Sequence, residues 1–231
     1  MIVREWSPVT HDFGLIEAPV AEVVRRLVAW HEGNGVRYRS QACTDSLEAC
    51  FRALLPLTHA KTRRLFLATR SGWTACFQNG IQGSDPFPAM SYLAIEMGVH
   101  AMRVCSTPPD AAYPARVWEL YAPEHMGGVP PLGVRRALGA VNDGGRWVFH
   151  DTGAPLPFED PARYTARRVA ERFTEATLAA YLEEGYGIRP FDDDFYVVSA
   201  ASPGVLLQQS TRVPREREFS LAEVKAGRPW Q

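Results

Sequence analysis

The chain has 231 residues, of which 46% are hydrophobic and 22% are charged, and its formal net charge is −1. These fractions are ordinary for soluble globular domains, and they argue against a disordered chain, a fibrous repeat or a membrane protein. A net charge close to zero gives no electrostatic reason to expect nucleic acid or an anionic membrane surface as a partner.

The cysteines and the N-terminal residues bear on the cellular localisation of the protein. Cys43, Cys50, Cys76 and Cys105 lie in largely apolar contexts, without a C-x-x-C pair or the density of a secreted disulfide scaffold. We expect them to be buried thiols. The first ten residues lack the apolar core of a signal peptide. The sequence therefore predicts a cytoplasmic protein, and nothing in it calls for a cofactor.

The N-terminal part alternates between strand and helix patterns. Pro19 occupies a favoured first helical position, and apolar residues follow it at helical spacing. Thr44 or Asp45 is expected to cap a second helix, because these side chains accept hydrogen bonds from free helical amides. The expected order is a strand at 13–17, a helix from 19 to 33, a strand at 36–41 and a helix from 45 to 55.

The middle of the chain changes in character. Two strand-like runs flank Arg70-Ser71-Gly72 and predict a hairpin. Asp85-Pro86 combines a capping residue with a proline and predicts a helix that ends at Gly98. The strands expected here lie at 65–69, 73–78, 99–105, 117–121 and 134–141.

The clearest local signals follow Asp143. Asp143-Gly144 predicts a tight turn before a strand at 146–150. Asp160-Pro161 predicts the start of one long amphipathic helix that reaches Gly185. A last strand pair is expected at 195–200 and 205–209, and a polar arm with a short helix at 221–225 follows it.

These elements predict an α+β fold with a mixed, largely antiparallel sheet and about four helices packed mainly on one face. We expect a single domain over residues 1–210 and a polar C-terminal arm over 211–231. A sub-boundary, if one exists, would fall in the proline-rich stretch 106–115.

Common catalytic motifs are absent from the sequence, including the phosphate-binding loop, the nucleophile elbow and H-E-x-x-H. The candidates that remain are scattered. His150 beside Asp151 has the residue types of a general base and its partner, and Glu119 is a carboxylate that would complete a dispersed site. Neighbouring residues of a strand point to opposite faces, so a structural role for His150 and Asp151 is favoured.

The run Asp192-Asp193-Asp194 offers oxygen ligands for Mg²⁺ or Ca²⁺, with Asp192 and Asp194 as the members that would converge on one ion. The run lacks the glycine and the glutamate of a calcium loop. A solvated turn is therefore the favoured interpretation, and we expect no bound metal. Two glycine loops, at 80–85 and 125–128, would let a backbone approach a ligand closely.

Aromatic residues on the predicted strands have two interpretations. Trp73 and Phe77 share a face, as do Trp147 and Phe149, whereas Trp118 and Tyr121 point to opposite faces. A core role is favoured, because the helices need an apolar sheet to cover. The alternative is a docking surface, for which the candidate anchors are Trp73, Trp118, Arg146 and Trp147.

We therefore expect a bacterial protein that binds another protein without catalysis, as an immunity protein or a regulatory partner would. The alternative is a hydrolase or transferase with a dispersed site built from His150, Asp151 and Glu119. A structure that brings these three side chains within hydrogen-bond reach of each other would favour the enzyme. The sequence leaves the oligomeric state open.

Overall fold

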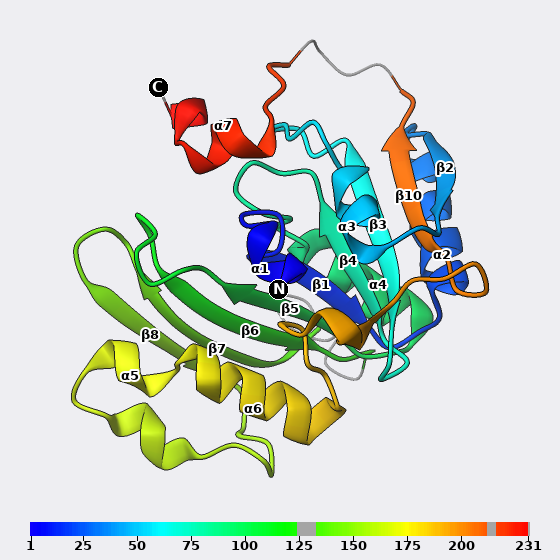
Figure 1. Ribbon diagram of the computed structural model, residues 1–231. Helices are drawn as coiled ribbons and strands as arrows, with labels where there is room; N and C mark the ends of the chain where they lie inside the picture. Colours follow the sequence, from blue (N-terminus) through cyan, green and yellow to red (C-terminus); the bar gives the residue numbers. More distant parts are fainter. Residues whose placement is uncertain (124–132, 212–215, 231) are drawn as a thin grey trace.

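The computed structural model describes residues 1–123, 133–211 and 216–230, and its centre is one ten-stranded sheet (Figure 1). The spatial order is β2-β10-β3-β4-β1-β5-β6-β7-β8, with β9 beside β3. Each pair of neighbouring strands runs antiparallel. The strands are β1 Asp12–Ile16, β2 Tyr38–Cys43, β3 Arg63–Thr69, β4 Thr74–Gln78, β5 Ala101–Ser106, β6 Ala115–Tyr121, β7 Val134–Asn142, β8 Trp147–Thr152, β9 Tyr196–Val197 and β10 Gly204–Gln209.

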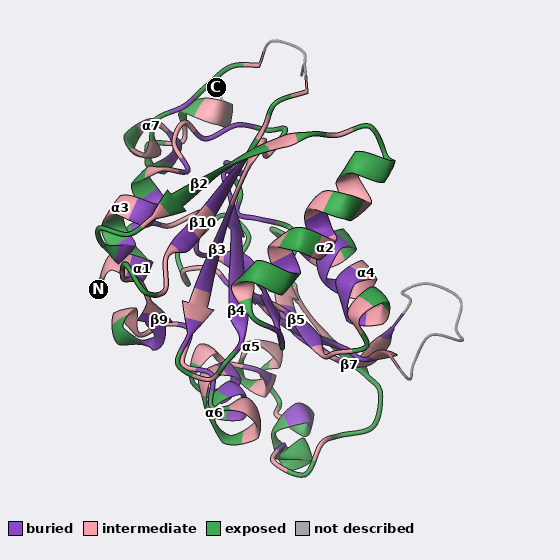
Figure 2. Cartoon of the chain, turned by 90° about the vertical axis from the view of Figure 1, so that its right-hand side faces the viewer, coloured by how far each residue is buried: buried purple, intermediate pink, exposed green. Residues whose placement is uncertain are grey.

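Helices cover both faces of this sheet, which confirms the α+β class and shows that packing on one main face is only approximate (Figure 2). Helices α2 and α4 cover one face, and α3 and α6 cover the other. None of the helices in the described ranges is long and apolar enough to cross a membrane. The helices are α1 Ile2–Glu5, α2 Val20–Gly33, α3 Leu47–Arg52, α4 Phe87–Met97, α5 Val169–Arg172, α6 Glu175–Tyr186 and α7 Leu221–Lys225, with 3₁₀ turns η2 Pro161–Thr165, η3 Asp193–Phe195 and η4 Arg228–Trp230.

Side-chain alternation along the strands divides the apolar residues into two cores. Trp118 lies in the core under α6, and Tyr121 lies in the core under α4, so these two residues point to opposite faces as predicted. Strand β4 is buried at all five positions, because helices cover it on both sides. The central strands are accordingly the most buried part of the molecule (Figure 2).

The predicted pairing of 195–200 with 205–209 is wrong. Only Tyr196–Val197 forms a strand, β9, and it pairs with Ala68 and Thr69 at one end of β3. Strand β10 instead lies between β2 and β3. The last strand therefore ties the end of the chain to its first third, a pairing that no local sequence signal encodes.

The predicted long helix from Asp160 to Gly185 is also wrong, because the chain breaks it into η2, α5 and α6. Asp160 acts as a cap, as expected, but it caps the 3₁₀ turn η2 by accepting a hydrogen bond from the Ala162 amide. Phe173 then takes an extended backbone and buries its ring completely. Thr174 caps a new helix by accepting a hydrogen bond from the Thr177 amide at 3.1 Å.

Two other helix starts differ from the prediction. Ser46, rather than Thr44 or Asp45, caps α3 by accepting a hydrogen bond from the Ala49 amide. Asp85 does not cap α4, because its backbone is left-handed with a φ of 48° and its carboxylate pairs with Lys61.

The segment 106–115 joins β5 to β6, which pair with each other from Ala101↔Tyr121 to Ser106↔Arg116. Beyond residue 210, helix α7 has the predicted bounds, and both Phe219 and Val224 are buried against the larger core. The domain limits drawn from the sequence remain a prediction.

Candidate functional site

The three predicted catalytic residues do not lie together. His150 is exposed on β8, opposite Gly139, and Asp151 points to the other face of the sheet, where its carboxylate binds Arg136 Nη1 at 2.5 Å. Glu119 shares a face with His150, but β7 separates their strands, and Glu119 accepts a hydrogen bond from the Tyr121 hydroxyl. No common site unites these three side chains.

The aspartate run holds the N-terminus in place. Asp193 accepts hydrogen bonds from the amides of Ile2 and Val3 at 2.8 and 2.9 Å, at the start of α1. Asp192 and Asp194 both pair with Arg189. Within the described ranges, no three His, Cys, Asp or Glu side chains are grouped so that they could hold a metal ion. The loop at 125–128 lies outside the described residues.

The candidate anchors are divided between core and surface. Trp73 and Trp118 belong to the core with exposed fractions of 4% and 0%, so neither ring is free to contact a partner. Trp147 is half-buried against the same core, and Arg146 is exposed in the turn before it. Only the pair at 146 and 147 remains near the surface.

Two loops lie next to each other at one end of the sheet and form what we call the tip surface, residues 107–114 and 143–146 (Figure 1). The Asn142 amide donates to the Pro114 carbonyl at 2.9 Å and joins the bases of the loops. The Tyr113 ring lies against Gly144, where a Cβ atom would be only 3.1 Å from Tyr113 Cε1. Gly144 also has a φ of 90°, which favours glycine.

Both loops are fixed by hydrogen bonds. The Asp143 carboxylate accepts from the amides of Gly145 and Arg146, both at 3.0 Å, and these bonds lower the pKa of Asp143. In the other loop, Thr107 Oγ1 accepts from the Ala115 amide at 2.7 Å. Between them they present Tyr113, which at 66% is the most exposed large hydrophobic side chain of the described residues.

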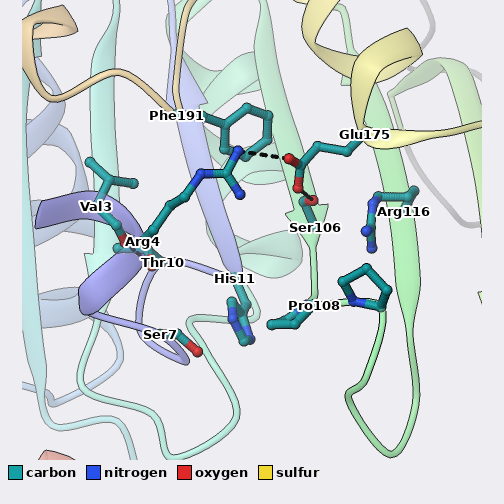
Figure 3. Close-up of a pocket in the computed structure, with 11 residues that line it drawn as sticks. Val3, Arg4, Ser7, Thr10, His11, Ser106, Pro108, Arg116, Glu175 and Phe191 are labelled. Carbon is teal, nitrogen blue, oxygen red and sulfur yellow. Dashed lines mark hydrogen bonds and ion pairs between the residues drawn. The ribbon is translucent and has the colours of Figure 1, made fainter. Parts of the chain in front are cut away.

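Beside the tip surface lies a pocket of about 350 Å³, which we call the α1 pocket (Figure 3). Its lining comes from α1 and the segment after it, the end of β5, the loop at 107–114, the start of β6, the first turn of α6 and the loop after α6. Its polar lining residues are Arg4, Ser7, Thr10, His11, Ser106, Arg116 and Glu175, and its apolar ones are Val3, Pro108, Pro109 and Phe191.

Glu175 is the carboxylate of this pocket, and it is already paired. Its Oε1 accepts from Arg4 Nη2 at 2.7 Å, and its Oε2 accepts from the Ser106 hydroxyl at 2.8 Å. Burial pushes the pKa of Glu175 upward, but the hydrogen bonds from Arg4 and Ser106 outweigh it, so the pKa is lowered. Glu175 is therefore charged near neutral pH.

His11 is the only histidine that lines the pocket. Burial, and secondarily the charge of Arg116, lower the pKa of His11 from 6.5 to about 4. The imidazole is therefore neutral at pH 7. The Ser106 hydroxyl donates to Glu175, a carboxylate that Arg4 neutralises, so this serine is not paired with a base that would activate it. The arrangement suits binding better than nucleophilic catalysis.

The depressed pKa of His11 predicts a loss of stability in acid. In the unfolded chain His11 takes up a proton near pH 6.5, whereas in the folded protein it does so only near pH 4. Protonation therefore favours the unfolded chain, and the stabilising contribution of neutral His11 is complete above pH 6.5 and is lost as the pH falls toward 4. We expect this histidine to account for on the order of 2 kcal/mol. Urea unfolding of wild type and His11→Gln at pH 7 and pH 4.5 measures it. The variant should lose less stability than wild type over this interval; equal losses would contradict the prediction.

A second hollow, of about 340 Å³, shares Ser7, His11 and Pro108 with the α1 pocket and reaches Val224 and Lys225 at α7. The two hollows therefore adjoin each other beside the loop at 107–114, and we call the pair the cleft. The cleft brings together residues from both ends of the chain.

Comparisons with protein-family models, with curated proteins and with solved structures find no match for this chain. The site therefore has to be interpreted from its own geometry. Sequence reasoning missed Tyr113, His11 and Arg116. One signal was present for Arg116, because strand alternation places it on the same inward face as Trp118.

Proposed function

We propose that this protein binds another protein through the tip surface and does not catalyse a reaction. The observation that supports the proposal most strongly is the exposure of Tyr113, at 66%, on two loops that hydrogen bonds hold in place. Tyrosine and arginine are the residue types that most often anchor protein interfaces, and Arg146 is exposed in the neighbouring loop.

Because the two loops are already held in one conformation, binding a partner through them costs less conformational entropy. A partner that docks on loops already fixed by Asp143 and Thr107 does not have to order them, so more of the contact energy is available for affinity. The tip surface projects from the sheet (Figure 1) and is thus shaped to enter a concave partner surface. The cleft at its base offers room for a segment of that partner.

This geometry suits a partner protein that has a functional cleft of its own, which the tip surface would cover. An immunity protein or a regulatory inhibitor in the bacterial cytoplasm works in this way, and we propose that role for this chain. The alternative, a hydrolase or transferase, would have to use the α1 pocket, because His150, Asp151 and Glu119 lie apart. The bond between Ser106 and Glu175 disfavours it.

The double variant Tyr113→Ala/Arg146→Ala tests the proposal. Loss of one interface anchor typically costs about 2 kcal/mol, which alone raises the Kd ~30-fold, so we expect the Kd of the double variant for the partner to rise by at least this factor. The partner is first isolated by affinity purification of wild type from its native cells, and both proteins are then titrated against it.

Arg37→Ala/Arg39→Ala is the control, because these arginines are exposed at β2, at the opposite edge of the sheet from β8. The control should bind like wild type, and circular dichroism should show that all variants are folded. Wild type that purifies without any stoichiometric partner, or a tip variant that binds as tightly as wild type, would refute the proposal.

A further inference from the structure

Two arginines are buried among the described residues, Arg116 and Arg136, and they differ in how their charges are compensated. Arg136 Nε and Nη2 donate to Glu159 at 2.8 and 2.6 Å, and its Nη1 binds Asp151. Burial alone would lower the pKa of Arg136, but these hydrogen bonds outweigh it and raise the pKa. The protein itself supplies the counter-charges of Arg136.

Among the described residues, no carboxylate forms a hydrogen bond or ion pair with Arg116, although Glu175 lies near enough to act on it through its charge. Arg116 Nη1 donates to the carbonyl oxygens of Thr107 and Ala115, and its Nε has no hydrogen-bond partner within the described part of the chain. Burial is the main cause that lowers the pKa of Arg116, and the nearby charge of Glu175 does not offset it. The residue is only 8% exposed, so water compensates the charge of its guanidinium poorly.

The charges in the α1 pocket do not cancel. Arg4 and Arg116 are cationic, Glu175 is anionic, and His11 is neutral because its pKa is about 4. Glu175 has one oxygen bonded to Arg4 and the other to Ser106. One positive charge, that of Arg116, is therefore left over in a partly enclosed pocket (Figure 3).

The remaining walls restrict what can provide the missing negative charge. Val3, Pro108, Pro109 and Phe191 make one side of the pocket apolar. A volume of about 350 Å³ is at the small end of ligand sites. One surplus positive charge matches a monoanion better than a phosphate dianion, and the planar guanidinium pairs well with a planar carboxylate.

We propose that the α1 pocket binds a carboxylate carried on a short apolar stem, with Arg116 as its charge partner. The carboxylate comes from a free organic acid or from a glutamate side chain of a polypeptide; the chemistry that the pocket recognises is the same. The site does not include the anchors Tyr113 and Arg146, although Pro108 and Pro109 of the Tyr113 loop line it.

The full chain is titrated with phenylacetate, with its uncharged analogue phenylacetamide and with inorganic phosphate, and isothermal titration calorimetry measures the binding of each. A hexapeptide with one central glutamate and blocked ends, and its glutamine counterpart, form the second arm. We expect phenylacetate to bind at least tenfold more tightly than the amide and phosphate. Binding of the glutamate peptide but not of its counterpart would identify a polypeptide source, whereas binding of phenylacetate alone would identify a free acid.

Variants connect the binding to Arg116. Arg116→Gln should abolish it, and Arg116→Lys should retain part of it, because lysine keeps the charge without the planar fork. Arg163→Gln, at an exposed arginine elsewhere, should bind like wild type. No carboxylate binding in either arm, equal binding of acid and amide, or unchanged binding by folded Arg116→Gln would overturn the proposal. Tyr113→Ala/Arg146→Ala should leave this binding intact, which separates the outcome from that for the tip surface.

Discussion

Replacing Glu159 by glutamine is expected to lower the free energy of unfolding by about 3–5 kcal/mol, because it leaves the Arg136 charge buried without its main partner. The side chains of both residues are completely inaccessible to solvent. Glu159 also accepts hydrogen bonds from the Tyr164 hydroxyl at 2.6 Å and from the Leu156 amide at 3.0 Å. A neutral amide at this position cannot accept all of these bonds and balance a guanidinium.

Asp151→Asn is the matched control. Asp151 binds the same guanidinium at 2.5 Å, but its side chain is 39% exposed, so water screens the pair. We expect a loss of about 1 kcal/mol or less for this variant. Urea denaturation at pH 7 compares the two. Equal losses for Glu159→Gln and Asp151→Asn would show that burial does not determine the strength of this network.

Trp118→Ala is expected to destabilise the protein by about 3–5 kcal/mol, because it leaves a large cavity in the core between the sheet and α6. Trp118 is completely buried, and its ring lies 6.1 Å from the Phe158 ring and 6.3 Å from the Tyr186 ring, centroid to centroid. A folded domain is typically stable by only about 5–15 kcal/mol, so this loss would be a large share of the total.

Trp118→Phe separates packing from hydrogen bonding. The Trp118 Nε1 atom is buried and has no hydrogen-bond partner among the residues that the structure describes. Phenylalanine therefore removes volume without breaking a bond, and we expect it to cost clearly less than alanine. Thermal and urea unfolding of both variants measure the difference. A phenylalanine variant as unstable as the alanine variant would mean that the indole makes a bond that this geometry lacks.

The sequence predicted elements well where the signal was local. The hairpin of β7 and β8 formed at Asp143-Gly144, and α7 has its predicted bounds, because turn and capping residues act on their immediate neighbours. The predictions from sequence were wrong where contacts between residues distant in the chain determine the structure. The core position of Phe173 breaks the predicted long helix, and β10 inserts between β2 and β3, more than a hundred residues away in sequence.

The candidate site shows the same division. Arg146 and Trp147 were predicted as anchors, and Arg146 does lie on the tip surface, because the turn that carries it is a local feature. Trp73 and Trp118 are buried, since alternation along a strand identifies a shared face but does not say whether a helix covers it. The α1 pocket combines Arg4, Arg116 and Glu175 from three distant segments, so no spacing in the sequence indicates it.

The most direct measurement of the central claim, that the tip surface contacts a partner protein, is site-specific photocrosslinking in the native cells. A benzoylphenylalanine in place of Tyr113 is compared with one in place of Gln41, which is exposed on β2 at the opposite edge of the sheet. We predict one discrete crosslinked protein from position 113 and none from position 41. No crosslinked species from position 113, or the same species from both positions, would contradict the account.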